Sequence, residues 1–347
     1  MDEALKKRLL DKLNDIDLKK LSDLHVVLLP DFFVDHFLYF DEFEESTDKI
    51  KNIYLQGGGN IPGVKQRIHQ GGNAANTALA LARLGVRSHL ICRTDRFGLH
   101  LLKYFLGKEG VDLSGVKSDG KLAITTAMEF GKEHSNVMLG DTGSVSDFSF
   151  NCLDDSDLER ISNSDMVCVL NWNLNNYGTK FAYDVFQFAK KHNVKTFFDS
   201  GDPSPRKKDI PDLLNNVLTG EHLDIFGLNE NELQHYAGAD VKTEEEIVNA
   251  AVLLKKRIPA RIDIHTAHFS CTVDKECNIV PSVPVSKIYR GTGAGDAWNA
   301  GNIFTELLDF QPDERLLFSN CFAAQYISSP EPVHATLPKA IVFLSKQ

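Results

Sequence analysis

The feature that most constrains the fold is an alternation of short apolar runs with helical patterns between residues 166 and 266. The runs are MVCVLN (166–171), KTFFDS (195–200), DIFGLN (224–229) and RIDIHT (261–266), with helices expected at 178–191, around 209–218 and at 242–257. Each run has the length of a buried strand. Strands that alternate with helices form βαβ units. The sequence therefore predicts an α/β fold with a mostly parallel central sheet and helices on both faces.

Further strands are expected earlier in the chain, at 25–29 (HVVLL), 86–92 and 123–130, and an extended segment at 281–288 precedes a helix at 312–328. Asp31 and Asp35 should lie in the turn after the first strand. Ligands of open α/β sheets bind beyond the carboxyl ends of the strands. At those ends stand Asp199, Asn229, Glu232 and Thr266.

Residues 290–301, RGTGAGDAWNAG, place several glycines before a helical pattern that begins near Asp296. Glycine lets the backbone turn sharply and approach a ligand closely. The amides of Gly293, Ala294 and Gly295 should then point outward from a helix N-terminus and form an anion hole. Asp296 has two readings, because aspartate is a favoured helix cap and is also suited to act as a general base toward a hydroxyl group.

A second glycine motif is HQGGNAANTALALARLG (69–85), which predicts a buried helix over 74–84 that ends at Gly85. Glycines before this helix again bring the backbone close to a ligand. The triplet Asp141-Thr142-Gly143 matches that of aspartic proteases, but no partner triplet or flap pattern accompanies it. A protease is therefore not favoured.

Composition narrows the class of partner. The 347 residues carry a formal net charge of −10 and no long Lys/Arg run, whereas nucleic acids and anionic membranes require a basic surface. No apolar run approaches the roughly 18 residues that span a bilayer. The six cysteines form no CxxC pair, and the first residues lack the apolar core of a signal peptide. We expect a cytoplasmic protein that acts on small molecules.

Three parts are expected along the chain. Residues 1–24 form an amphipathic helical extension, and residues 25–36 with 71–347 form the α/β domain. Residues 37–70 combine an acidic stretch, a strand-like KNIYLQ, the glycines 57–59 and a basic KQRIH, which suggests a β-excursion that serves as a lid. Residues from about 120–140 are a further candidate for the lid. The alternative is a surface insertion without function.

These residues resemble the PfkB, or ribokinase-like, carbohydrate kinases from about His25 to Ser328. The most specific matches are GGNAAN (71–76) and GTGAGDAWNAG (291–301), which is similar to the second signature of the family with Trp298 in the usual phenylalanine place. Weaker matches are Asp35, the stretch 95–98 (DRFG) and the Asn-x-x-Glu motif at 229–232. The two glycine motifs stand in the expected order, some 220 residues apart.

The resemblance implies a ribokinase-like fold with a small β lid, and transfer of the γ-phosphoryl group of ATP to a hydroxyl of a sugar-like molecule. Asp296 takes the place of the catalytic base, with the anion hole at Gly293, Ala294 and Gly295. The resemblance assigns the acceptor to Asp35, Gly71, Gly72 and Asn76, the nucleotide to Asn229, Thr266, Thr292 and Asn320, and Mg²⁺, through water, to Glu232 and Asn229. Oxygen ligands of this kind suit Mg²⁺.

Some residues depart from the family pattern. Arg290 replaces an aspartate that is often associated with a monovalent cation, so potassium activation is not expected. His268 stands where a nucleotide-loop glycine is common, and residues 330–332 (PEP) replace the usual Gly-Ala, which predicts a reshaped nucleotide pocket. Phe33 occupies an often polar position and predicts an apolar face on the acceptor.

Other functions stay open at this point. One is a member of the same fold that binds a sugar or nucleotide without turnover, and another is a nucleoside or polyol kinase. A nucleotide-dependent oxidoreductase is disfavoured because no GxGxxG follows the first strand, and a P-loop kinase because no GxxxxGK[ST] occurs. Lids of this family often pair between subunits, so the resemblance also implies a homodimer, with candidate contacts at Phe37, Tyr39, Phe40 and Ile53.

Overall fold

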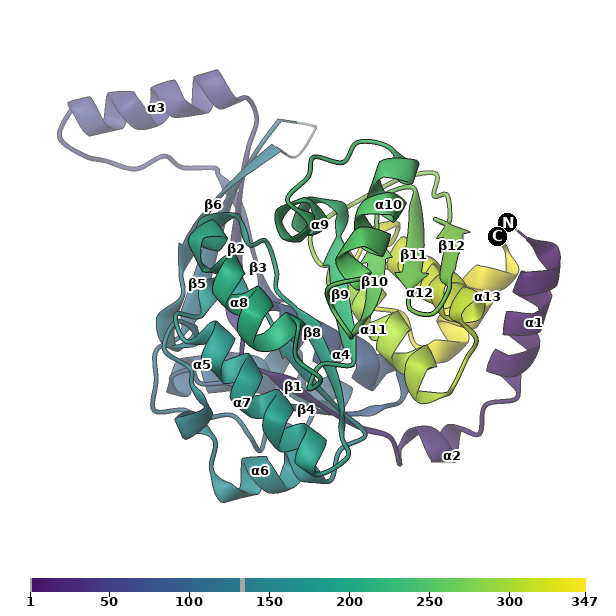
Figure 1. Ribbon diagram of the computed structural model, residues 1–347. Coiled ribbons are helices and arrows are strands. Elements are labelled where there is room, and N and C mark those ends of the chain that lie inside the picture. Colours follow the sequence, from purple (N-terminus) through teal and green to yellow (C-terminus); the bar gives the residue numbers. More distant parts are fainter. Residues whose placement is uncertain (1, 132–134) are drawn as a thin grey trace.

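The computed structural model describes residues 2–131 and 135–347, and it contains an eight-stranded main sheet and a four-stranded small sheet (Figure 1). The main sheet has the order β12-β11-β10-β9-β8-β7-β1-β4. Its strands are β1 (His25–Leu29), β4 (Arg87–Leu90), β7 (Met166–Leu170), β8 (Lys195–Asp199), β9 (Ile225–Asn229), β10 (Arg261–His265), β11 (Phe269–Val273) and β12 (Cys277–Pro281). Strands β10 to β4 pair in parallel, and β11 and β12 are antiparallel. The mostly parallel α/β sheet is therefore confirmed.

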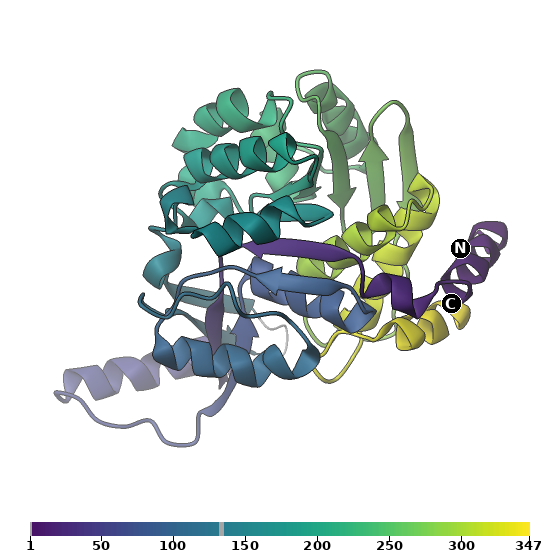
Figure 2. The same ribbon diagram turned by 90° about the horizontal axis from the view of Figure 1, so that it is seen from below.

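Helices cover both faces of this sheet, as Figure 2 shows from below. The alternating side chains of β1 make the division visible, since Val26 and Leu28 pack with one set of helices and Val27 and Leu29 with the other. The first set comprises α4 (Asn73–Leu84), α5 (Arg96–Phe105), α11 (Ala294–Leu307), α12 (Pro312–Ile327) and α13 (Leu337–Ser345). The second comprises α6 (Asp155–Ser162), α7 (Gly178–Lys191), α8 (Ile210–Leu213), α9 (Glu230–Ala237) and α10 (Glu244–Lys255).

The N-terminal extension consists of two helices, α1 (Glu3–Asn14) and α2 (Leu18–Leu21), instead of one. The break follows from Asp17, whose side chain accepts a hydrogen bond from the amide of Lys19 and so starts a new helix. Helix α1 buries its leucines against the body of the protein. Arg8 and Lys12 on its polar side form ion pairs with the buried Glu314 of α12, at 3.0 and 2.6 Å.

The small sheet has the order β3-β2-β5-β6, with β2 (Phe33–Phe40), β3 (Lys65–Gly71), β5 (Ala123–Phe130) and β6 (Ser135–Asp141). Segments from both predicted lid regions thus pair with each other, although residues 132–134 lie outside the described part of the chain. Because β2 begins at Phe33, Asp35 lies within a strand, and its predicted place in a turn was wrong. The predicted extended segment at 281–288 was also misplaced, since the last strand is β12.

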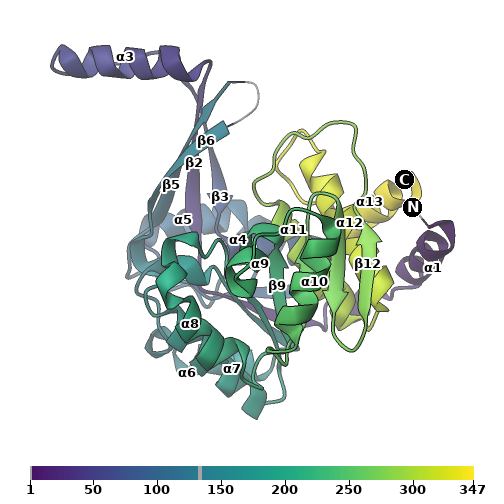
Figure 3. The same cartoon turned by 45° about the horizontal axis from the view of Figure 1, so that its top comes forward.

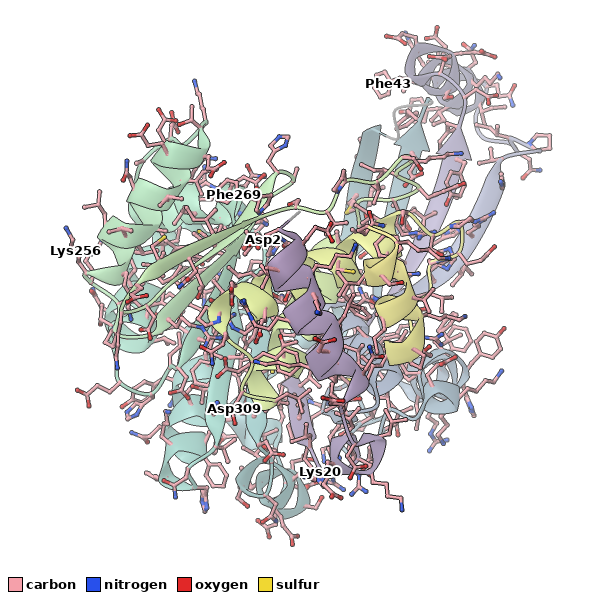
Figure 4. All side chains as sticks on the ribbon, turned by 90° about the vertical axis from the view of Figure 1, so that its right-hand side faces the viewer. Asp2, Lys20, Phe43, Lys256, Phe269 and Asp309 are labelled. Carbon is pink, nitrogen blue, oxygen red and sulfur yellow. The ribbon has the colours of Figure 1, made fainter. Side chains whose placement is uncertain are left out.

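A helix, α3 (Phe43–Leu55), connects β2 to β3 and projects beyond the end of the small sheet (Figures 1 and 3). The prediction of a strand for KNIYLQ was therefore wrong. The apolar residues Ile50, Ile53 and Tyr54 recur at helical spacing, and Glu45 forms an ion pair with Lys49 one turn later, at 2.6 Å. Figure 4 places Phe43, where this helix begins, on the arm that projects from the body.

In the part of the chain that the structure describes, no helix is long and apolar enough to cross a membrane. The N- and C-terminal ends lie next to each other (Figure 1), at the side of the body that α1 and α13 cover.

Candidate active site

A cavity of about 290 Å³ separates the carboxyl ends of the main-sheet strands from the small sheet. Many of its residues come from the small sheet and from the ends of two main-sheet strands. Strands β8 and β9 both end in a polar residue, Asp199 and Asn229. The lining residues are Phe33, Asp35, Phe37, Gly72, Asn73, Asn76, Thr125, Ala127, Met138, Asn171, Leu174, Asp199, Asn229, Glu232, His265, Thr292, Gly293, Gly295 and Asp296. The structure thus brings most of the predicted site residues together in one place.

The N-terminus of α11 opens into this cavity. Gly293 begins the helix with a φ of 82°, and a Cβ there would lie 2.9 Å from the hydroxyl oxygen of Tyr326. Only glycine fits both requirements. Gly293 and Gly295 line the cavity, whereas Ala294 does not and its amide donates to the carbonyl oxygen of Gly291 at 3.1 Å. Two of the three residues predicted for the anion hole therefore line the cavity.

Asp296 lies in the first turn of α11 and is 8% exposed. The helix cap is Gly293, and no side chain caps this N-terminus, so Asp296 has no capping role in the structure. Its Oδ2 accepts a hydrogen bond from the side-chain Nδ2 of Asn76 at 2.9 Å. Burial holds the pKa of Asp296 well above the ordinary carboxylate range, and the charges of Asp199, Asp31 and Asp35 add to this effect. A carboxyl group with a raised pKa is suited to accept a proton.

Asp31 holds the first glycine motif in place. It is fully buried, and its carboxylate accepts hydrogen bonds from the amides of Asn73 and Ala74 at 2.9 and 2.8 Å and from the side chain of Asn171 at 2.6 Å. These bonds satisfy the first amides of α4, which no side chain of its own caps. Burial nevertheless raises the pKa of Asp31 to about 6. The sequence analysis predicts that Asp31 lies near the ligand, but it does not predict that Asp31 holds the start of α4.

Asp35 faces the cavity from strand β2. Its carboxylate lies against Gly71, where any Cβ would clash with it, and this explains the glycine although Gly71 itself does not line the cavity. Gly72 adopts a φ of 94°, and a Cβ there would lie 3.0 Å from the Oδ2 of Asp31. Burial raises the pKa of Asp35 to about 6, against the opposing effect of a hydrogen bond from Thr125. Phe33 and Phe37, two residues to either side, supply an apolar lining.

The Asn-x-x-Glu motif forms a capping box at the start of α9. The Oδ1 of Asn229 accepts hydrogen bonds from the amides of Asn231 and Glu232, and the Oε2 of Glu232 accepts one from the amide of Asn229 at 3.0 Å. The box has a structural role and at the same time holds both side chains at the cavity. Burial, followed by the charge of Asp199, raises the pKa of Glu232 well above its ordinary value.

Asp199 ends strand β8 and is 5% exposed. It accepts hydrogen bonds from the amide of Gly201 at 2.8 Å and from the side chain of Asn299 at 2.6 Å. Burial raises its pKa, and its charge raises the pKa of Glu232 and of Asp296. Asp199 therefore acts electrostatically on two candidate functional carboxyl groups.

This set of carboxyl groups fits a divalent cation. None of the described residues that line the cavity is lysine or arginine, so no side chain there offsets the charges of Asp199, Glu232 and Asp296. A cation would stabilise their ionised forms. Within the described ranges, no three His, Cys, Asp or Glu side chains lie close enough to hold a metal ion by themselves. Water and phosphate oxygens would have to complete the coordination, as is typical of Mg²⁺ sites.

Two residues predicted to bind the nucleotide do not line the cavity. The Oγ1 of Thr266 donates to the carbonyl oxygen of Phe269 at 2.9 Å and accepts from the amide of the same residue, which closes the turn after β10. Asn320 accepts a hydrogen bond from the indole of Trp298 at 2.9 Å and donates to the carbonyl oxygens of residues 280 and 281. Both side chains stabilise the wall behind the cavity.

The side chain of Arg290 binds the end of α12 and the residues that follow it. It donates to the carbonyl oxygens of Tyr326, Ser329 and Pro330 at 2.9, 2.7 and 2.8 Å. Its guanidinium carbon also lies 5.3 Å from the centre of the Tyr326 ring. The positive charge beside these carbonyl oxygens therefore comes from the side chain of Arg290.

Several cavity residues were not assigned from the sequence, among them Asn171, Thr125 and His265. Burial lowers the pKa of His265 to about 4, and its ring centre lies 5.0 Å from that of Trp298. Asn171 follows β7 directly, and His265 is the last residue of β10. Their position at the end of a buried strand could have identified Asn171 and His265, whereas Thr125 lies within β5 and carried no such signal.

Comparison with known proteins agrees with this geometry. Residues 39–340 match the family described as pfkB family carbohydrate kinase. A 5-dehydro-2-deoxygluconokinase of Clostridium perfringens is 25% identical over 75% of this chain and 78% of its own length. A ribokinase of Haemophilus influenzae is 25% identical over 78% and 85%, respectively.

Solved structures share the fold. The Arabidopsis thaliana ribokinase complexed with ribose and ATP has a TM-score of 0.76 and 19% identity, and covers 92% of this chain and 98% of its own. The adenosine kinase of Sinorhizobium meliloti has a TM-score of 0.74 and 17% identity, with the same coverage. The fold is ribokinase-like, and the family match spans most of the chain. The protein belongs to the pfkB family of carbohydrate kinases, which are phosphotransferases with an alcohol group as acceptor.

Proposed function

We propose that this kinase transfers the γ-phosphoryl group of ATP to a hydroxyl group of a sugar-like molecule held between Asp35 and Asp296. The observation that carries the proposal is the buried Asp296 beside the open N-terminus of α11, hydrogen-bonded to Asn76 and not used as a cap. A base and an anion hole lie within one turn of the same helix. Phosphoryl transfer depends mainly on positioning and charge stabilisation, which such an arrangement supplies.

Different residues of the chain contribute to different parts of the reaction. Asp35, together with Asn76 and the backbone at Gly72, forms hydrogen bonds with the hydroxyl groups of the acceptor and orients them. Asp296 takes the proton of the hydroxyl that attacks phosphorus. The amides of Gly293 and Gly295 stabilise the negative charge that develops on the transferred group. Phe33 and Phe37 pack against the carbon skeleton of the acceptor and exclude water.

ATP and Mg²⁺ are the proposed donor and cofactor. Two similar solved structures are ribokinases in complex with ribose and ATP and with ADP, which supports a nucleotide donor for this chain. Glu232 and Asn229 would hold Mg²⁺ through water, and Asp199 adds charge at the same end of the cavity. When bound, Mg²⁺ would neutralise phosphate charge. Thr292 at the cavity is the proposed nucleotide contact, with Thr266 and Asn320 behind it.

The small sheet and α3 are proposed to act as the lid. Their apolar side chains Ile68 and Leu139, 55% and 57% exposed, also fit a homodimer formed through this sheet. All six cysteines are free, which favours the reducing cytoplasm. The charge of −10 favours small molecules over nucleic acid or membrane partners.

The test is ADP release from ATP and Mg²⁺ with a panel of neutral sugars, polyols, nucleosides, sugar acids and sugar phosphates. We expect release that depends on one class of acceptor and on Asp296. Binding of both ligands without acceptor-dependent release would support a sensor of the same fold and contradict the proposal.

A further inference from the structure

The strand pair β2–β3 places basic side chains on the face of the small sheet that borders the cavity. In an antiparallel pair, directly opposite residues point to the same face. Asp35 is opposite His69, and Phe37 is opposite Arg67. Because Asp35 and Phe37 line the cavity, the side chains of His69 and Arg67 lie on the same face of the sheet, although neither lines the cavity itself. The ring centre of His69 lies 5.8 Å from that of Phe37, which agrees with this placement.

A second cation approaches the same edge from the main domain. His69 is half-buried, and its pKa is lowered first by burial and then by the charges of Arg67 and Arg290, while Glu331 acts in the opposite direction. The two guanidinium groups therefore lie near one imidazole. Arg290 already donates to three carbonyl oxygens. In the part of the chain that the structure describes, the guanidinium group of Arg67 has neither an ion-pair nor a hydrogen-bond partner, and the side chain is exposed.

Other charged groups stand further toward the tip of the small sheet. Tyr39 is opposite Lys65 on β3 and Glu129 on β5, and the ammonium nitrogen of Lys65 lies 5.7 Å from the centre of the Tyr39 ring. Arg67 is thus the basic residue between this group and Asp35. On β3, Arg67 is two positions from His69, which is opposite Asp35, and Lys65 is two positions further along the strand.

The spacing suits a small acceptor with a charged end. Phe37 is two residues from Asp35, and two residues of a strand cover roughly 7 Å. This is comparable with the length of a five- or six-carbon sugar. A sugar that places one hydroxyl between Asp35 and Asp296, and extends along β2, would bring its opposite end toward the strand position of Phe37 and Arg67. The carboxyl groups around the reacting hydroxyl would repel an anion there, so a negative charge is accepted only at the Arg67 edge.

We propose that the acceptor carries a carboxylate or phosphate group at the end remote from the reacting hydroxyl, and that Arg67 binds this anion. The inference rests on the proposed kinase function. Guanidinium groups pair with carboxylate and phosphate oxygens through two parallel hydrogen bonds, which makes arginine the suitable residue at this edge. Arg67 determines specificity and takes no part in the transfer itself.

The first experiment compares matched acceptors with ATP and Mg²⁺: glucose, gluconate and glucose 6-phosphate, and ribose, ribonate and ribose 5-phosphate. We expect kcat/KM for at least one anionic member to exceed that of its neutral counterpart by about 10- to 100-fold, the range of one charge-assisted interaction. Arg67→Met should remove this preference through KM, with kcat within about twofold. Comparison of the acids with the phosphates identifies which anion the site takes.

A matched control is Arg87→Met, because Arg87 is an exposed strand arginine at the amino end of β4, away from the cavity. It should leave the preference unchanged. Equal losses for neutral and anionic acceptors in Arg67→Met, or a preference for the neutral sugars in the wild type, would overturn the inference.

Binding separates this inference from the kinase proposal. Calorimetric titration of the same six compounds into the full-length protein needs no turnover. Tighter binding of an anionic compound than of its neutral partner, lost in Arg67→Met, supports the anion site even if no ADP is released. If ADP release occurs only with neutral acceptors and no anionic compound binds more tightly, the kinase proposal stands and the anion site is wrong.

Discussion

The two walls of the cavity differ in charge and in burial. The main-sheet wall presents the buried carboxyl groups of Asp199, Glu232 and Asp296, and includes no described lysine or arginine. The small-sheet wall presents aromatic rings and Asp35, and Arg67 and His69 lie on the same face of this sheet. Helices cover both faces of the main sheet, whereas several apolar side chains of the small sheet remain exposed. We therefore propose that the more buried main-sheet wall performs the transfer and that the more exposed small-sheet wall selects the acceptor.

The largest expected effect comes from the main-sheet wall. Asp296→Asn preserves shape and removes the proposed proton acceptor, so kcat should fall by about 10² to 10⁴. Affinity for ATP and for the acceptor should change little, as titration calorimetry would show. Asp309→Asn is the matched control, because it makes the same change just beyond the other end of α11 (Figure 4). A variant that retains more than about a tenth of the wild-type kcat would refute the role of Asp296 as base.

The small-sheet wall should respond to the acceptor as a lid. Hydrogen exchange of residues 37–70 should slow by about tenfold or more at a saturating concentration of the best acceptor, since closure protects amides that open easily in a less packed region. Residues 166–170 of β7, buried in the main sheet, are the internal reference and should not change. Unchanged exchange over 37–70 would mean that this segment is an insertion without a role in closure.

The contrast between the walls also marks what the sequence could predict. The main sheet was predictable because each buried strand is a short apolar run between helical patterns, as at 166–170 and 225–229. Asp296 was identified through the glycines that precede it. Asp31 lies next to the first strand, yet its bonds to Asn73 and Asn171 come from residues 42 and 140 positions away, which no local pattern reveals.

The small sheet was harder to predict for physical reasons. Its strands carry polar residues on both faces, so alternation does not mark them, and KNIYLQ contains the β-branched and aromatic residues that also suit a strand. Its basic KQRIH was noted, but the alignment of Arg67 with Phe37 depends on strand register across β2 and β3. Register follows from pairing and is not fixed by composition.

The coupling between carboxyl groups of the main-sheet wall gives a pH test. The charge of Asp199 raises the pKa of Asp296, so Asp199→Asn should lower that pKa. Asp296, the proposed base, is then ionised at lower pH. The acidic limb of the pH profile of kcat/KM should therefore move to lower pH, even if the maximal rate falls. Asp212→Asn removes an exposed carboxylate on α8 and should leave the limb in place. A limb that stays or moves to higher pH in Asp199→Asn would contradict the coupling.

The smallest expected effect concerns monovalent cations at the edge of the cavity. Arg290 donates to the carbonyl oxygens of Tyr326, Ser329 and Pro330, so these oxygens already have a positive partner in the chain. Replacing K⁺ by Na⁺ or tetramethylammonium at constant ionic strength should therefore change kcat/KM by less than about twofold. Arg290→Met leaves three carbonyl oxygens without this donor, and K⁺ should then raise the activity of the variant more than tetramethylammonium does, since carbonyl oxygens bind bare cations. Strong stimulation of the wild type by K⁺ would show that the guanidinium does not replace a bound ion.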